Sequence, residues 1–136
     1  MNIGILLRTP FQKLVEKIHE DLAAAGYPEI RPAHGVVFQF IGKKGARLTE
    51  LAKKAQITKQ SMSYLLEYLE KEGHVERLED ETDGRAIKFR LTTKGWKAVD
   101  VAESAIAAFE LNCKTRLGTT KYKQLLDLLS LLNSTV

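Results

Sequence analysis

The sequence predicts a mainly α-helical fold that carries one small β-hairpin. Two short amphipathic segments, residues 49–55 and 59–72, are separated by very few residues, as in two helices joined by a tight turn. Alternating apolar and polar residues follow at 75–79 and 86–91, which indicates two short strands. Long apolar stripes with helical spacing lie on both sides of this central region. We therefore expect helices at both ends of the chain and a hairpin between them.

Length and composition are those of a globular protein with one domain, or one domain and an added oligomerisation element. The chain has 136 residues, 44% of them hydrophobic, so we expect a buried core rather than disorder. Its net charge of +4 is compatible with a nucleic-acid partner. Cys113 is its single cysteine, which excludes an internal disulfide and is typical of a reducing compartment. No apolar run reaches membrane-spanning length, so we expect a soluble cytoplasmic protein and no membrane partner.

The first predicted helix covers residues 2–25. Its apolar residues share one helical phase, and they are Ile3, Leu7, Phe11, Leu14, Ile18 and Leu22. Pro10 lies within this phase, so it either kinks one long helix or begins a second helix that Thr9 caps. The unbroken phase favours one kinked helix. Gly26 and Pro28 are typical of the chain just beyond a helix.

The next helix is expected to begin at Pro32, because proline suits the first turn of a helix. Its inward residues are Val36, Val37, Phe40 and Ile41. Gly42 ends it, a basic loop follows over residues 43–46, and Arg47 comes next. We expect Thr49 to cap the following helix, with Glu50 favoured in the first turn by the helix dipole.

Residues 49–73 predict a helix-turn-helix. Gln56 and Ile57 form the turn, Thr58 caps the second helix, and Gly73 ends it. The apolar stripe of the second helix consists of Met62, Leu65, Leu66 and Leu69. Because so short a turn holds the two helices together, Ile57 is expected to fill the corner between them.

A hairpin directly after this unit would be the wing of a winged helix-turn-helix. In its second strand the apolar residues are Ile87, Phe89 and Leu91, and the residues between them are Lys88 and Arg90. That alternation indicates a strand with one buried face. Asp83-Gly84 between the strands is a strong signal for chain reversal.

Two further helices are predicted after the hairpin. Thr92 caps the first, residues 93–116, whose stripe consists of Val99, Ala102, Ile106, Phe109 and Cys113. Gly118 interrupts the chain before the last helix, residues 121–132. The apolar residues of that helix include Tyr122, Leu125, Leu126, Leu129 and Leu132. For Cys113 we favour a buried structural thiol over a redox sensor, since no sequence neighbour would lower its pKa.

The N-terminal tip of the second helix of the helix-turn-helix has a polar outer face. Its residues are Lys59, Gln60, Ser61, Ser63 and Tyr64. This face has one cation and no carboxylate, and it suits the major groove of DNA, where base edges present donors and acceptors. On composition alone an ordinary solvated helix surface is an equal alternative. The hairpin that follows favours DNA.

With these segments in place, the chain resembles the MarR family of transcriptional regulators. The matching segments are Leu48-Thr49-Glu50-Leu51-Ala52, residues 58–73, Val75-Glu76-Arg77, Asp83-Gly84-Arg85 and Leu91-Thr92-Thr93-Lys94-Gly95. The resemblance implies a winged helix-turn-helix homodimer whose N- and C-terminal helices interdigitate. It also implies that two recognition helices enter major grooves of a palindromic operator. Tyr64 departs from the family, in which many members have arginine.

The resemblance implies three segments and two sets of site residues. The segments are an N-terminal dimerisation helix in 1–30, a winged DNA-binding domain in 31–92 and C-terminal dimerisation helices in 93–136. The expected DNA contacts are Thr58, Lys59, Gln60, Ser61, Ser63, Tyr64, Thr82, Asp83, Gly84 and Arg85. The expected dimerisation residues are Leu7, Phe11, Leu14, Leu125, Leu129 and Leu132. Burial of these apolar residues inside one subunit is the alternative, but a small subunit has little to cover them with.

Arg85 and the basic residues near the turn each have two interpretations. Arg85 could form only a surface ion pair with Asp83, or Asp83 could orient it toward a minor groove, and we favour the combined role. The basic cluster is either a solvated surface or a set of phosphate contacts. Its members are Lys43, Lys44, Arg47, Lys53 and Lys54.

No cofactor, metal site or enzymatic activity is expected. His19, His34 and His74 are isolated and lack the spacing of helical metal ligands, so we expect surface or capping residues. His34, near Arg31, could also line a ligand cleft. The sequence contains no phosphate-binding loop and no nucleophile elbow.

The sequence therefore predicts a transcriptional regulator, with repression favoured, that binds double-stranded DNA as a homodimer. Its two recognition helices must lie about 34 Å apart to match one turn of DNA. The resemblance implies that a small aromatic molecule or another signal could release DNA by changing this separation. The competing hypothesis is a winged-helix module that binds protein and not DNA, for which the tip of the second helix should be apolar or acidic.

Overall fold

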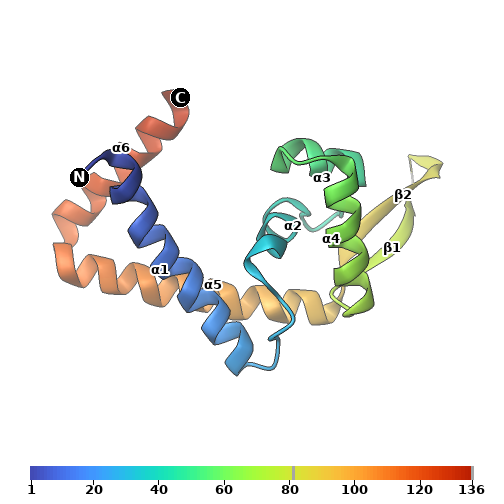
Figure 1. Cartoon of the computed structure of the whole chain (residues 1–136), viewed down its shortest axis with the longest axis horizontal. Coiled ribbons are helices and arrows are strands. Elements are labelled where there is room, and N and C mark those ends of the chain that lie inside the picture. The colour runs from blue at the N-terminus through green and yellow to red at the C-terminus, as the bar shows by residue number, and fades with distance from the viewer. Residues whose placement is uncertain (81, 136) are drawn as a thin grey trace.

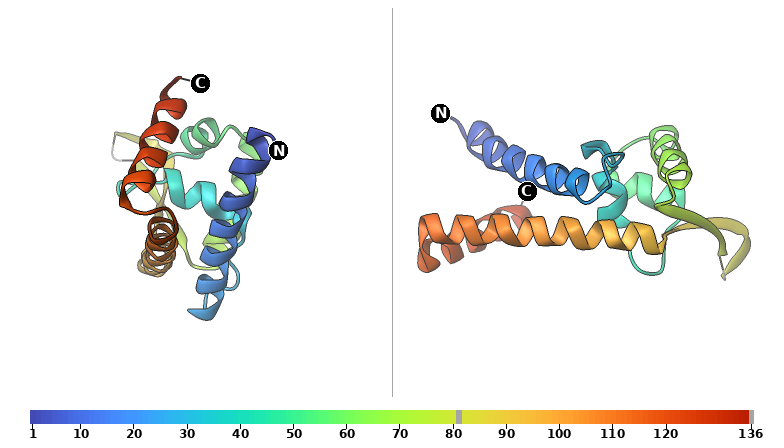
Figure 2. Two further views of the ribbon diagram at one scale, coloured as in Figure 1. Left: turned by 90° about the vertical axis from the view of Figure 1, so that its left-hand side faces the viewer. Right: turned by 90° about the horizontal axis from the view of Figure 1, so that it is seen from below.

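The computed structural model describes residues 1–80 and 82–135, and it has the predicted order of helices and strands (Figure 1). The elements are α1 Ile3–Ala24, η1 Pro32–His34, α2 Gly35–Phe40, α3 Leu48–Ala55, α4 Lys59–Lys71, β1 Val75–Asp80, β2 Asp83–Leu91, α5 Thr93–Leu117 and α6 Thr119–Thr135. The mainly helical fold with a two-stranded antiparallel hairpin is confirmed. The hairpin projects at one end, and α6 lies at the opposite end of α5 (Figures 1 and 2).

α1 is a single helix that includes Pro10, so the alternative of two helices is wrong. The side chain of Asn2 caps it by accepting a hydrogen bond from the amide of Ile5 at 3.1 Å. Every residue from 1 to 13 is exposed, whereas Leu22, nearer the C-terminal end, is buried. The apolar stripe is therefore covered only in its second half, where α1 packs against α5.

Two predicted helix starts differ from the structure. Pro32 begins a 3-10 turn rather than an α-helix, and α2 follows it at Gly35. Thr49 is not the cap of α3, because it lies inside the first turn of that helix, which begins at Leu48. The preceding residue, Arg47, is extended, and its amide donates to the Glu50 carboxylate at 3.4 Å. The acidic residue of the first turn thus performs the capping expected of the threonine.

The helix-turn-helix forms as predicted around α3 and α4. Gln56 ends α3 in the left-handed region with φ 57°, and the amide of Ile57 donates to the carbonyl of Ala52 at 3.1 Å. Thr58 caps α4. The fully buried stripe of α4 consists of Met62, Leu66 and Leu69. It packs with Val37, Ile41, Leu51, Val75, Phe89 and Leu91 into the main core.

The hairpin is longer than predicted and gains a partner. β1 continues to Asp80 and β2 begins at Asp83. The loop before α3 pairs with β2, because Ala46 donates to Phe89 at 2.9 Å and accepts from it at 2.8 Å. Gly45 permits this approach, since it has φ +78° and an added Cβ would lie 2.5 Å from the carbonyl oxygen of Phe89. Ile87, expected on the buried face, is 48% exposed.

α5 and α6 extend the chain away from this core. Both are longer than predicted, and α6 has no buried residue among its described positions. A second core joins α1, the following linker and α5 through Leu22, Ile30 and Ala98. Cys113 is half-buried, so its predicted burial is wrong, because the last turns of α5 lie beyond the part of the helix that α1 covers. Among the described residues, no helix has the length and apolar character needed to cross a bilayer.

Candidate nucleic-acid interface

The tip of α4 presents a polar surface. The oxygen of the Thr58 hydroxyl accepts from the Ser61 amide at 3.0 Å, and the same hydroxyl donates to the Ser61 oxygen at 2.9 Å. The first of these bonds gives a partner to the Ser61 amide, which has no acceptor within the first turn of the helix. The residues that remain exposed are Thr58, Lys59, Gln60, Ser61 and Tyr64. Tyr64, the aromatic residue of the predicted set, is 72% exposed.

Ser63 is half-buried and faces the hairpin rather than the exposed tip. It lines a shallow hollow between α4 and the hairpin, together with Leu48, Glu67, Arg77, Ile87 and Phe89. Among the predicted site residues, Ser63 is therefore the one on the side of α4 toward the wing. The hollow therefore lies between the hairpin and the side of α4 that carries Ser63 and Glu67.

The predicted wing residues lie at the far end of the hairpin. Thr82, Gly84 and Arg85 are exposed. The side chain of Asp83 lies outside the described residues, so its predicted role in orienting Arg85 stays a prediction. The backbone nevertheless brings the tip of α4 and the end of the hairpin to one side of the molecule (Figure 1).

Asp80 attaches the base of the wing tip to the start of α3. It is 5% exposed, and its carboxylate accepts from the Nε and Nη2 atoms of Arg47, each at 2.7 Å. The other carboxylate oxygen accepts from the amide and the hydroxyl of Thr82, at 3.0 and 2.8 Å. The hydrogen bonds from Thr82 and Arg47 hold the pKa of Asp80 well below its usual range.

Sequence reasoning missed this attachment. It counted Arg47 among five basic residues that contact phosphates or solvent, and the structure engages its guanidinium with Asp80. An aspartate directly before a reversal, with threonine two residues later, is the local signal for such a turn. The partner lies 33 residues away in sequence, where no local pattern indicates it. The other four members, Lys43, Lys44, Lys53 and Lys54, are exposed.

A second contact joins the hairpin to α4. The Nε atom of Arg77 donates to both carboxylate oxygens of Glu70, at 3.1 and 3.0 Å. The same guanidinium lies 5.2 Å from the centre of the Phe89 ring. With Asp80 holding the tip, the hairpin is attached at both ends to the helices beside it.

Substituting Asp80 with alanine should loosen the wing tip without unfolding the core. We expect the amide of Thr82 to exchange its hydrogen at least about tenfold faster, because it loses its acceptor. Hydrogen exchange followed by NMR measures this directly. Glu76→Gln is the matched control, since Glu76 pairs with Arg90 on the same hairpin but both side chains are about half exposed. Equal exchange rates in wild type and Asp80→Ala would show that Asp80 does not hold the tip.

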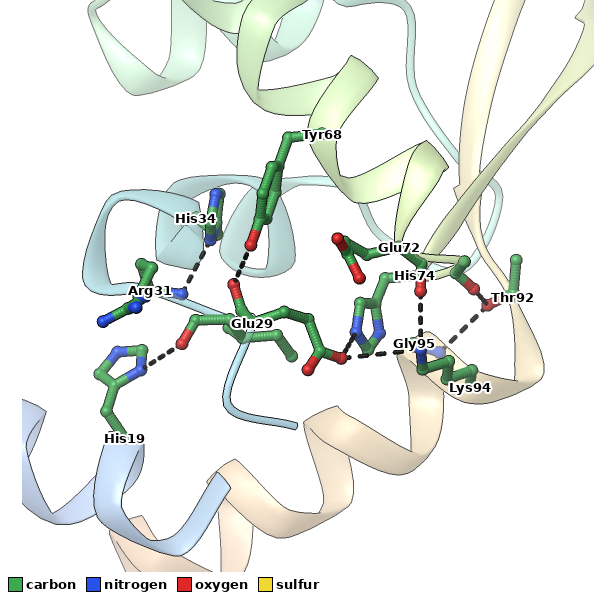
Figure 3. A network of polar contacts seen from close by, with 12 residues as sticks. His19, Glu29, Arg31, His34, Tyr68, Glu72, His74, Thr92, Lys94 and Gly95 are labelled. Atoms are coloured by element: carbon green, nitrogen blue, oxygen red, sulfur yellow. Dashed lines mark hydrogen bonds and ion pairs between the residues drawn. The ribbon is translucent and has the colours of Figure 1, made fainter. Parts of the chain in front are cut away.

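The sequence predicts surface or capping positions for His34 and His74; neither is at the surface, and capping is confirmed for His34. His34 is 6% exposed and His74 is fully buried. His34 does cap, because its Nδ1 accepts from the amide of Arg31 at 2.8 Å, and its ring stacks on Tyr68 (Figure 3). Burial lowers the pKa of His34 from its usual value. His74 follows the end of α4, where the start of α5 covers it. No group of residues suited to a metal ion is found among residues 1–80 and 82–135.

The fold and this face define a winged helix-turn-helix protein, with α4 in the position of the recognition helix. The MarR family model matches residues 30–86. These residues, which contain the helix-turn-helix and most of the wing, therefore belong to the MarR family.

One curated protein and several solved structures are similar to this chain. The HTH-type transcriptional regulator BilQ of Clostridioides difficile is 22% identical over 82 residues, which cover 60% of this chain and 55% of that protein. The chain thus matches about half the length of this curated relative. The S. aureus MepR–DNA complex has a TM-score of 0.77 and 23% identity, covering 100% of this chain and 99% of that one. The repressor CouR bound to a 23-mer DNA duplex has a TM-score of 0.74 and 23% identity, covering 97% and 92%.

Proposed function

We propose that this chain is a sequence-specific DNA-binding transcriptional regulator, acting as a repressor on a palindromic operator. The exposed tip of α4, which has no carboxylate and lies beside the wing, is the observation that carries the proposal. Its hydroxyl, amide and ammonium groups suit base edges and phosphates. The same domain has further positive charge on exposed lysines, which are Lys43, Lys44, Lys53 and Lys54. The DNA-bound states of the similar MepR and CouR structures support the same interpretation.

We also propose that the functional unit is a homodimer joined through the predicted terminal segments, 1–30 and 93–136. Leu7 and Phe11 on α1 are 45% and 63% exposed, and Leu125 on α6 is 40% exposed. The larger set of exposed apolar residues on these helices includes Ile3, Leu6, Leu128, Leu131 and Leu132. So much apolar surface at one end of a small subunit is typical of an interface. A second copy of the same chain would cover it on both subunits with one symmetric contact.

The proposed signal is a small aromatic molecule that changes the separation of the recognition helices. Its support is the resemblance to the family together with the aromatic side chains where α4 approaches the linker after α1. Titration of a DNA complex with small aromatic acids and phenols, followed by fluorescence anisotropy, tests this part alone. Release by none of them would leave DNA binding in place and remove the effector from the proposal.

Selection of bound fragments from random DNA is the experiment that tests the central proposal. We expect enrichment of an inverted repeat whose half-sites lie about one helical turn apart. A protein-interaction module is the alternative, and it predicts no enrichment and no retention on heparin at low salt. Enrichment of single half-sites without symmetry would contradict the dimer on a palindrome.

Arg85→Ala tests the wing. We expect affinity for the selected duplex to fall by about 1–3 kcal/mol, because a specific base or groove contact is lost while the core is untouched. Fluorescence anisotropy measures the affinity, and sedimentation checks that the protein keeps its wild-type mass. Arg116→Ala, at the far end of α5, removes the same charge from the opposite part of the subunit and should bind as wild type. Equal affinities for Arg85→Ala and wild type would exclude the wing from the interface.

A further inference from the structure

The linker between α1 and η1 meets three other elements at Glu29 (Figure 3). The Glu29 carboxylate accepts from the Nε2 atom of His74 at 2.8 Å and lies 3.6 Å from the ammonium of Lys94, in the first turn of α5. The backbone oxygen of Glu29 accepts from the hydroxyl of Tyr68, on α4, at 2.8 Å. This residue therefore connects the linker to α4, to the turn before β1 and to α5.

The surroundings make the carboxylate difficult to replace. His74 is fully buried, and the rings of Tyr27 and Phe38 lie edge-on to it at 5.7 and 6.1 Å. Burial by itself would raise the pKa of Glu29, but the hydrogen bond from His74 and the charge of Lys94 lower it overall, so the carboxylate stays ionised. Without it, the Nε2 atom of the fully buried His74 would lose its hydrogen-bond partner.

The end of α4 is also attached directly to the start of α5. The amide of Thr92 donates to the carbonyl of His74 at 3.0 Å, and the ammonium of Lys94 donates to the carbonyl of Glu72 at 2.7 Å. These bonds lie close together at the C-terminal end of α4, while the buried stripe of Met62, Leu66 and Leu69 packs the helix against the main core. The bonds that Glu29 makes to Tyr68 and His74 add attachments from the linker after α1, so the C-terminal end of α4 is held from two sides.

We propose that Glu29 is a positioning residue that sets the direction of the recognition helix relative to α1 and α5, and with it the half-site spacing that the dimer accepts. The inference rests on the proposed function, because it treats α4 as the recognition helix and α1 and α5 as the dimer framework. Glu29 itself does not touch DNA. Its carboxylate determines how narrowly the protein selects the separation of two half-sites.

A series of duplexes tests this spacing preference. The selected operator is compared with versions that have one base pair added or removed between the half-sites, using the full chain and fluorescence anisotropy. Wild type should strongly prefer one spacing. Glu29→Ala should bind that preferred duplex about tenfold more weakly, the factor that corresponds to one hydrogen bond to a charged group, and should lose much of the preference. Glu29→Gln keeps an oxygen that can accept from His74, so it should retain the wild-type spacing preference.

Two further variants separate positioning from general destabilisation. Asp21→Asn removes a carboxylate from an exposed ion pair with Lys17 on α1 and should keep the wild-type preference. Tyr68→Phe removes the hydrogen bond from the Tyr68 hydroxyl to the backbone oxygen of Glu29 and should also weaken the spacing preference. This variant replaces Glu29→Ala in the test if Glu29→Ala folds poorly.

The outcomes distinguish the inference from the function on which it rests. Two results would overturn the positioning role alone. One is a Glu29→Ala protein that keeps the wild-type spacing preference. The other is a Glu29→Ala protein that loses affinity equally at every spacing and has a lower midpoint of thermal unfolding. Wild type that binds no duplex at any spacing would overturn the proposed function and this inference with it.

Discussion

Gly95→Ala is expected to destabilise the fold by about 3 kcal/mol or more, since it forces two backbone segments apart. An added Cβ at Gly95 would lie 2.3 Å from the carbonyl oxygen of His74 and 3.2 Å from the side chain of Leu91. A carbonyl oxygen held by the amide of Thr92 cannot move aside as the end of a flexible side chain can. The first turn of α5 must then separate from the end of α4.

Urea denaturation followed by circular dichroism measures this loss. Gly35→Ala is the matched control, because Gly35 has helical angles of φ −54° and ψ −36° and an added Cβ meets nothing within 4 Å. We expect that control to be neutral or more stable by up to about 1 kcal/mol, through a smaller entropy of the unfolded chain. A Gly95→Ala protein as stable as wild type would mean that α5 does not press against His74 in solution.

The second large effect is expected from Leu129→Asp, which should dissociate the proposed dimer. Leu129 lies on α6, a helix with no buried residue among its described positions, yet it is partly covered. If a second copy covers α6, the substitution buries an unpaired carboxylate at each interface. That burial should cost at least about 3 kcal/mol, or more than roughly a hundredfold in the dissociation constant.

Sedimentation over a range of protein concentrations measures the dissociation. Gln39→Asp introduces the same charge at an exposed polar position on α2, outside the proposed dimer segments, and it should leave the mass unchanged. Circular dichroism checks that Leu129→Asp remains helical. A Leu129→Asp protein that sediments as the wild-type dimer would place the interface elsewhere and remove α6 from it.

Local patterns were sufficient for the helices, the turn and the hairpin, because each depends on neighbours in sequence. The stripe of Met62, Leu66 and Leu69 predicts the buried face of α4, and Thr58 predicts its start, since a cap acts within one turn. Thr49 failed as a cap because the glutamate that follows it can satisfy the amide of Arg47 instead. The sequence alone does not show whether the threonine or the glutamate will cap the helix.

Contacts between distant segments could not be predicted in the same way. Arg47 and Asp80 are separated by 33 residues, and Glu29 and His74 by 45. No local pattern indicates these partners, so the sequence predicted Arg47 as a solvated or phosphate-binding cation and His74 as a surface or capping residue. Their burial and pairing exist only once the hairpin and the linker have packed against α3, α4 and α5.

The sequence by itself determined the order of the elements, the buried stripe of the recognition helix and the polar tip opposite it, because helical period and capping are local properties. The tertiary structure decided how these parts are held. It attached the wing tip through Asp80 and the recognition helix through Glu29, since both attachments depend on packing that brings residues remote in sequence into hydrogen-bonding distance.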